Sequence, residues 1–214
     1  MADTGRLFDS IIATLQMTIW SGAVMFVCGM TLGIIMAVTG DSGIMRQRVV
    51  HRVLDKIINV CRSVPFIIFI AVLLPVTKAI MGTKIGVRGV IVPLVAASVP
   101  IFVRQVESAL ANVGSGLVEA ALAMGKSPMN IIFTVYLRES VPALARGTTI
   151  TLINLIGLTA MAGYVGAGGL GDYAITWGYN YGHYDIIWVS VLFVILIVSV
   201  IQFIGNLIAK KFSH

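Results

Sequence analysis

The chain has 214 residues, of which 58% are hydrophobic and only 11% are charged, whereas an ordinary soluble domain carries about 25% charged residues. This composition leaves too little polar surface to cover a soluble core, so it argues against a soluble enzyme and favours a protein solvated by lipid. The formal net charge of +6 does not indicate a nucleic-acid-binding protein, because the basic residues are spread over the segments between apolar runs.

Five apolar segments are candidates for membrane-spanning helices, each of which needs about 20 apolar residues. In chain order they are residues 10–40, 57–77, 89–106, 145–166 and 185–209. The second contains Arg62, and the third contains Arg104 near its end. The sequence therefore predicts an all-α fold, a polytopic helical membrane protein with five transmembrane helices in a single domain over residues 1–214.

The basic residues between the spans predict the orientation, because cytoplasmic loops carry an excess of Lys and Arg. The positions that would share one side with the C-terminus are Arg46, Arg48, Arg52, Lys56, Arg104, Lys126, Arg138, Arg146, Lys210 and Lys211. The other side would hold Arg6, Lys78, Lys84 and Arg88. An odd number of spans places the termini on opposite sides. We therefore expect an external N-terminus and a cytoplasmic C-terminus.

Arg62 lies inside the second predicted span, three residues before Pro65. A charged side chain is costly in a bilayer, and a proline frees a backbone carbonyl there. Two interpretations remain. Arg62 reaches the cytoplasmic interface near Lys56, which we favour, or it contacts the substrate.

The longest loop, residues 107–142, has a helical pattern with a break at residues 125–128. The apolar stripe before the break consists of Leu117, Val118, Ala121, Leu122 and Met124, and the stripe after it of Ile131, Ile132, Val135 and Tyr136. Gly125 is typical of a helix end, Ser127 of an N-cap and Pro128 of a first helical turn. The loop is therefore predicted to be a cytoplasmic helix–turn–helix.

Residues 120–127 also match a loose form of the phosphate-binding P-loop, A-x-x-x-x-G-K-S. A P-loop needs a buried strand, a flexible glycine-rich turn and a helix that starts at its Lys-Ser. Here the turn would consist of strong helix formers, no apolar strand precedes it, and Pro128 follows Ser127. An ATP site on this chain is therefore not expected.

The motif E-A-A at residues 119–121, followed by three residues and Gly125, resembles the EAA loop of permease subunits of bacterial ABC importers. That pattern continues with nine residues and I-x-L-P. Val135 and Leu137 fit it, whereas Arg138 stands where Pro is usual, with Pro142 four residues on. Three further segments are similar to methionine-importer permeases, namely RSVPF at 62–66, IVPL at 91–94 and GYVGAGGLGD at 163–172.

This resemblance implies a non-catalytic permease subunit of the bacterial cytoplasmic membrane, which would work as a homodimer with two ATP-binding subunits and an external substrate-binding protein. ATP and Mg²⁺ would bind to the partner subunits, with no cofactor, metal or nucleic acid on this chain. The coupling residues that it implies are Glu119, Ala120, Ala121 and Gly125. Without the resemblance, the same stretch is simply a good interfacial helix.

Two segments near the predicted outer face carry motifs of their own. Residues 166–171, GAGGLG, match a dinucleotide-binding pattern, but no βαβ unit surrounds them. A compact turn with close backbone approach is the better interpretation, either as turn chemistry alone or as a surface for a substrate-delivering protein.

Residues 177–184 are aromatic and form either an interfacial belt or a docking surface. His183 has no partners at metal-ligand spacing.

The fourth span is rich in small and polar residues, a composition typical of helix–helix contacts and of a translocation lining. Met161 is a flexible apolar side chain suited to closing a narrow constriction. The candidate path or gate residues are Met161, Asn154 and Thr159. Tight helix packing is the alternative.

The predicted function is therefore the permease subunit of an ATP-driven importer that moves methionine or a related small amino acid by alternating access. Two alternatives remain. One is an ABC permease for a different small solute, and the other is a secondary transporter or channel that works alone. Ion-coupled carriers usually place ionisable groups in their spans. The uncharged runs at residues 10–40, 147–171 and 186–209 contain no Asp or Glu, which argues against proton coupling.

Overall fold

The computed structural model describes residues 4–212, and every regular element within them is helical. In chain order the elements are α1 (Thr4–Thr39), α2 (Arg48–Ser63), α3 (Phe66–Met81), α4 (Gly86–Ala111), α5 (Ser115–Ala123), α6 (Pro128–Ile131), η1 (Ile132–Tyr136), α7 (Leu137–Ala162), η2 (Gly163–Ala167), α8 (Gly169–Asp172), η3 (Tyr173–Tyr179) and α9 (Tyr184–Lys211), where η marks a π-helical segment. The predicted all-α class is confirmed.

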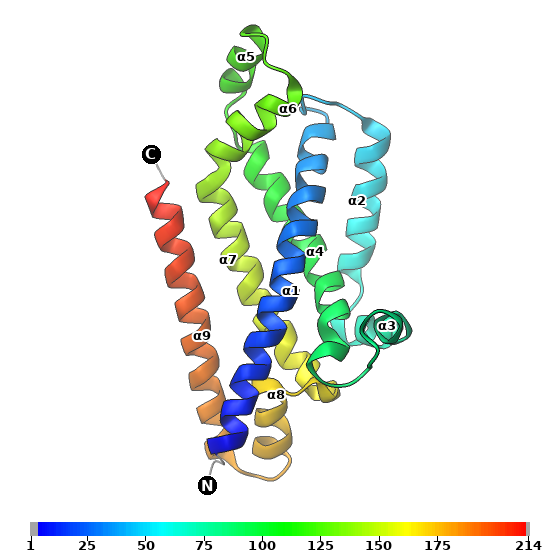
Figure 1. The fold of residues 1–214 in the computed structure, drawn as a ribbon, viewed down its shortest axis with the longest axis vertical. Coiled ribbons are helices and arrows are strands. Elements are labelled where there is room, and N and C mark those ends of the chain that lie inside the picture. The colour runs from blue at the N-terminus through cyan, green and yellow to red at the C-terminus, as the bar shows by residue number, and fades with distance from the viewer. Residues whose placement is uncertain (1–3, 213–214) are drawn as a thin grey trace.

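The long helices α1, α4, α7 and α9 run side by side along the longest axis of the molecule (Figure 1). The short helices α5 and α6 lie at one end, and the C-terminus lies toward that end. The N-terminus lies at the other end, beside α8. The two termini are thus at opposite ends, as an odd number of membrane crossings requires.

Glycines on α1 bring its backbone close to α4, the helix with which it makes its most extensive contact. A Cβ atom at Gly29 would lie 2.6 Å from Cδ1 of Phe102, and one at Gly33 would lie 2.5 Å from Cβ of Val106. Small residues four apart allow such close helix packing within a membrane, where van der Waals contact drives association. The side chains of Phe102 and Val106 on α4 therefore pack directly against the backbone of α1.

The second predicted span is not a single straight helix. The structure divides it into α2 and α3, which meet at an angle of 110°. Val64 between them has φ −85° and ψ 124°, an extended conformation. Proline disfavours helical geometry in the residue before it, so Pro65 ends α2 and starts α3 in a new direction. Within residues 4–212, four helices are long and apolar enough to cross a membrane, or five if the bent pair forms one span.

The fourth predicted span, residues 145–166, begins earlier than expected. The helix starts at Pro128 and runs through α6, η1 and α7 into η2, where Val165 and Gly166 leave helical geometry and form a kink. Pro142 is tolerated inside it, and the π-helical segment η1 precedes that proline by a turn and a half. The predicted loop at residues 107–142 is correspondingly shorter, because α4 continues to Ala111 and only the part around α5 leaves the bundle. The second helix of the predicted helix–turn–helix is the start of the fourth span.

Candidate functional site

The end of α5 is closed by a Schellman motif centred on Gly125. The N–H of Lys126 donates to the carbonyl of Ala121 at 3.1 Å, and the N–H of Gly125 donates to the carbonyl of Leu122 at 2.9 Å. Gly125 has φ +75°, in the left-handed region, while the space around its Cα is open. Glycine is therefore required there for backbone conformation and not for lack of room.

The next helix begins as the sequence predicts. The side chain of Ser127 accepts a hydrogen bond from the N–H of Asn130 at 3.4 Å, and Pro128 occupies the first turn. An N-cap of this kind satisfies one of the amide groups left free at a helix start. The four residues 124–127 thus form a short connection with a defined conformation at both ends, so α5 is held at a fixed angle to the long helix that starts at Pro128.

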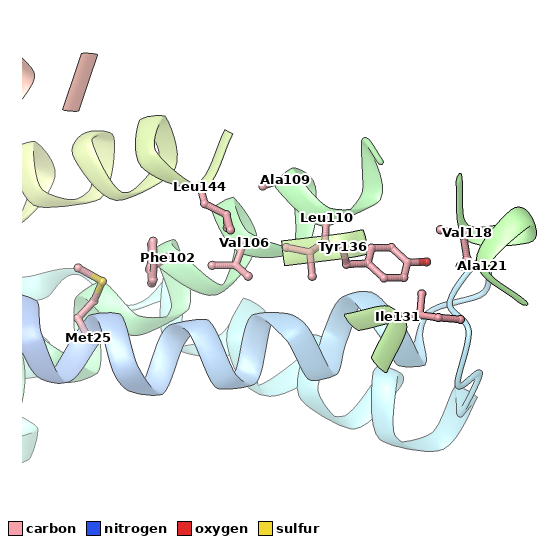
Figure 2. Packing of buried hydrophobic residues seen from close by; sticks show 10 residues of the cluster. All are labelled: Met25, Phe102, Val106, Ala109, Leu110, Val118, Ala121, Ile131, Tyr136 and Leu144. Carbon is pink, nitrogen blue, oxygen red and sulfur yellow. The ribbon is translucent and has the colours of Figure 1, made fainter. Parts of the chain in front are cut away.

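One face of α5 is buried against the body of the molecule. Val118 and Ala121 are 7% and 2% exposed and belong to the same core cluster as Ile131 and Tyr136 (Figure 2). That cluster continues through the bundle as Met25, Phe102, Val106, Ala109, Leu110 and Leu144. One packed cluster therefore connects α5 with residues of α1, α4 and α7.

The other face of α5 is exposed and largely apolar. Glu119 and Ala120 lie on this side, so they do not share a face with the buried Ala121. On α5, Leu117 and Leu122 are 51% and 48% exposed. Met124 at its C-cap, Met129 on α6 and Phe133 on η1 are 69%, 60% and 62% exposed. Of the five residues in the predicted apolar stripe, Val118 and Ala121 are buried, whereas Leu117, Leu122 and Met124 are exposed. An exposed apolar patch of this kind is typical of a protein–protein interface.

A cavity of about 340 Å³ lies beside α5, where the buried Val118 and the exposed Glu119 and Leu122 all line it. It is lined by Ala37, Ser42, Gly43, Ile44, Leu110, Ala111, Val113, Ser115, Val118, Glu119, Leu122 and Tyr136. The loop after α1, the end of α4 and the start of the long helix all reach this cavity. Four parts of the chain thus meet directly beneath the exposed surface of α5.

A second candidate surface runs along α7. Asn154, Gly157 and Met161 are exposed, at helical spacing, and Ile150 extends the same face. An unpaired amide such as that of Asn154 is costly in hydrocarbon. This face is therefore better suited to water or to another protein surface than to lipid chains.

Thr159 does not belong to that exposed face. It is 1% exposed, and its hydroxyl donates to the carbonyl of Ile156 at 2.7 Å. Thr148, Thr149 and Thr151 likewise donate to carbonyls one turn back on α7. The candidate residues of the fourth span thus fall into two groups. Thr159 is buried in helix packing, whereas Asn154 and Met161 lie on the exposed face.

The glycine-rich segment 163–171 forms a close turn at the end opposite α5. Gly166, Gly168 and Gly169 have positive φ, and a Cβ atom at Gly163 would lie 2.5 Å from the backbone nitrogen of Asp172. The N–H of Leu170 donates to the hydroxyl of Thr14 at 2.9 Å, which ties α8 to α1. The predicted compact turn with close backbone approach is confirmed. Across residues 4–212 no three or more His, Cys, Asp or Glu side chains gather as a metal site.

Residues 29–214 match the protein family described as binding-protein-dependent transport system inner membrane component. The chain belongs to this family. The family membership agrees with the resemblance carried by residues 119–125, and it makes the chain a multi-pass inner-membrane component of a binding-protein-dependent transport system. It does not favour a secondary transporter that works alone.

Named relatives of the inner membrane component are similar over most of their length. The probable D-methionine transport system permease protein MetI of Vibrio cholerae is 42% identical over 201 residues, 94% of this chain and 89% of that protein. The methionine import system permease protein MetP of Bacillus subtilis is 42% identical over 172 residues, 80% of this chain and 78% of that protein.

Solved structures of inner membrane components share the whole fold. A chain of the MetNI methionine ABC transporter, in a study of its inward-facing conformations, has a TM-score of 0.96 and 38% identity, with 100% of both chains covered. A chain of an amino acid ABC transporter has a TM-score of 0.78 at 14% identity, over 97% of this chain and 94% of its own, which shows a shared fold alone. The overall fold of this chain therefore recurs in solved ABC transporters.

One polar contact of this inner membrane component was not expected from its sequence. The guanidinium of Arg104 on α4 contacts the carboxylates of Asp55 on α2 and of Glu107 one turn along α4, and it also donates to the amide oxygen of Asn59 at 3.0 Å. Asp55 and Arg104 are 49 positions apart in the sequence, so no local pattern pairs them. Arg62, by contrast, is exposed near the end of α2.

Proposed function

We propose that this chain is the permease subunit of an ATP-driven importer that moves methionine across the cytoplasmic membrane. Support comes from relatives named as methionine permeases, which are 42% identical over 94% and 80% of the chain. The observation that carries the mechanism is the exposed apolar surface of α5 and α6, which is held rigidly above a core cluster shared with α1, α4 and α7.

In this proposal α5 docks into a groove on a separate ATPase subunit, in the manner of an amphipathic helix in a groove. Glu119 and Ala120 lie on the docking side, while Ala121 and Gly125 fix the position and the end of the helix. This chain carries out no catalysis, and ATP and Mg²⁺ bind to the ATPase. Two copies of the chain would pair and be served by two ATPase subunits and an external substrate-binding protein.

The translocation path would lie where the α7 faces of two protomers meet, with Asn154 and Met161 toward it. ATP binding would move α5, and packing through Val118, Ala121 and Ile131 would pass that movement to the bundle. Because the surface helix is rigidly connected to the spans, its movement would switch them between outward-facing and inward-facing arrangements, which is alternating access. Thr159 acts within the packing of α7 and not in the path.

The proposed orientation places α5, α6 and the C-terminus in the cytoplasm and the N-terminus outside. The excess of basic residues on the side of α5 supports this orientation. It is tested by labelling single cysteines at Ser115 and Gly182 in intact cells with a membrane-impermeant maleimide, after Cys28 and Cys61 have been replaced by Ser. Labelling at residue 182 alone is the expected result. Labelling at residue 115 alone would reverse the orientation.

A further inference from the structure

The helix α2 carries two parallel stripes that the proposed transport function does not use. It lies at the edge of the molecule (Figure 1), and among its residues Ile58 alone is buried. Val49, Val53, Ile57 and Val60 are 71%, 51%, 53% and 65% exposed. Their spacing of three and four residues places them along one side of the helix, so they form a continuous apolar stripe.

A basic stripe runs beside the apolar one. Arg48, Arg52 and Lys56 follow each other at four-residue intervals and are all exposed. A shallow groove of about 220 Å³ joins the two stripes and is lined by Val49, Arg52, Val53 and Lys56. Cations and aliphatic side chains therefore meet in one site on the surface of α2.

The acidic groups nearest to this site are already engaged elsewhere. The carboxylate of Asp41 accepts from Arg46 at 2.8 Å and Arg48 at 3.3 Å, and the hydrogen bond from Arg46 holds the pKa of Asp41 below its usual range. The carboxylate of Asp55 faces Arg104 on α4.

Arg52 and Lys56 consequently keep their positive charge uncompensated. The Nε–H of Arg52 donates only to the backbone carbonyl of Arg48, at 3.2 Å. Within residues 4–212, neither Arg52 nor Lys56 forms an ion pair with a carboxylate. Two neighbouring cations with no counter-charge from the protein attract an anion from outside it.

We propose that α2 binds an anionic glycerophospholipid of the leaflet on the side of α5, with the lipid phosphate at Arg52 and Lys56 and an acyl chain along Val53, Ile57 and Val60. Long basic side chains reach from an apolar surface to the headgroup level, and the cytoplasmic leaflet is the anionic one. The assignment of the leaflet rests on the orientation proposed above.

A lipid fits this site better than a protein segment does. The groove is shallow, and its two stripes run along a helix that stands roughly parallel to α1 (Figure 1). An acyl chain aligned with the membrane normal can follow Val53, Ile57 and Val60 while its phosphate stays beside Arg52 and Lys56. The charge of the site is complementary to phosphate, and the aliphatic stripe is complementary to hydrocarbon.

The test is native mass spectrometry of the complete importer, released from detergent micelles that contain equal amounts of phosphatidylglycerol and phosphatidylcholine. We expect the wild-type complex to retain phosphatidylglycerol preferentially. The double variant R52Q/K56Q should lose that preference by roughly 25-fold, because each basic side chain near an anionic surface contributes a factor of about five. The variant R52K/K56R should keep it, and so should the control K210Q/K211Q, whose lysines are exposed at the end of α9.

The proposal would be overturned by equal retention of the two lipids in the wild type, or by an unchanged preference in R52Q/K56Q. Loss of the permease dimer in R52Q/K56Q, with lipid retention unchanged, would assign the site to a protein partner instead. Copurification of the ATPase is recorded in the same spectra. Failure of the lipid proposal is thus distinguished from failure of the proposed transport function, which predicts the ATPase in every sample.

Discussion

The backbone N–H of Lys126 donates a hydrogen bond to the carbonyl of Ala121 at 3.1 Å, and this bond closes α5 directly beneath its exposed apolar face. Ala121 itself is buried, so the same residue anchors the helix by its side chain and ends it by its backbone. The surface proposed to meet the ATPase is thus rigidly linked to the transmembrane bundle.

The left-handed conformation of Gly125 predicts how this position responds to substitution. G125A should destabilise the end of α5 by about 1–2 kcal/mol, because a Cβ atom disfavours positive φ. We expect reduced copurification of the ATPase and at least tenfold slower uptake. G125N should lie between G125A and the wild type, since Asn tolerates this conformation better than Ala. The matched control is G116A, in the first turn of α5 with open space around it, which should leave uptake unchanged. Equal losses in G116A and G125A would contradict this explanation.

Glu119 is the charged group on the proposed docking face, and reversing its charge should weaken the docking. We predict that E119K lowers ATPase copurification at least tenfold, while E119Q has a smaller effect. The control is E139K, which changes an exposed carboxylate at the start of α7, away from α5. The amount of ATPase retained on the affinity-purified permease is the measurement. Full retention in E119K would show that Glu119 does not take part in docking.

The division of the fourth span into two faces predicts a pattern of cysteine reactivity. In a background that lacks Cys28 and Cys61, N154C and M161C should react with a water-soluble maleimide in the inward-facing state. T159C should not react because its side chain is buried, and L196C, exposed on α9, should not react because lipid covers it. Reaction rates at N154C and L196C are expected to differ at least tenfold. Equal rates would remove the proposed path.

The contact between Arg104 and Asp55 predicts a coupling between α2 and α4. D55N should lower the stability of the detergent-solubilised protein by about 1 kcal/mol, a value limited by partial exposure of both side chains. The double variant D55R/R104D, in which the two charges are exchanged, should recover part of the lost stability. Neither D55R nor R104D alone should do so. R48Q, which alters a fully exposed pair with Asp41, should change the thermal midpoint very little. A double variant that is no more stable than the sum of its single changes would show that the two helices are not coupled there.

Local chemistry made the coupling loop predictable from the sequence. Gly125, Ser127 and Pro128 each have one well-defined use at a helix boundary, and the structure uses them in that way. The sequence did not indicate which members of the apolar stripe on α5 are buried, and Leu117, Leu122 and Met124 are exposed. Hydrophobic periodicity identifies apolar positions but does not distinguish a face buried in the same chain from a face kept for a partner.

The long-range geometry of the helices was less predictable from the sequence. Residues 57–77 were predicted as one span, whereas the chain turns by 110° at Pro65, and that change of direction depends on how α3 packs against α4. Pro142 suggests a boundary, yet the helix passes through it because packing on both sides outweighs one lost hydrogen bond. The approach of Gly29 to Phe102 and of Gly33 to Val106 pairs residues about 70 positions apart, which no local pattern identifies.

The central claim is that this chain imports methionine only together with an ATPase that docks on α5. The most direct measurement is uptake of radiolabelled methionine into proteoliposomes that contain the permease, its ATPase and its binding protein, with ATP on the side of α5. We predict uptake that requires ATP and all three components and that is lost in G125A but kept in G116A. Uptake by the permease alone, driven by an ion gradient without ATP, would contradict the account.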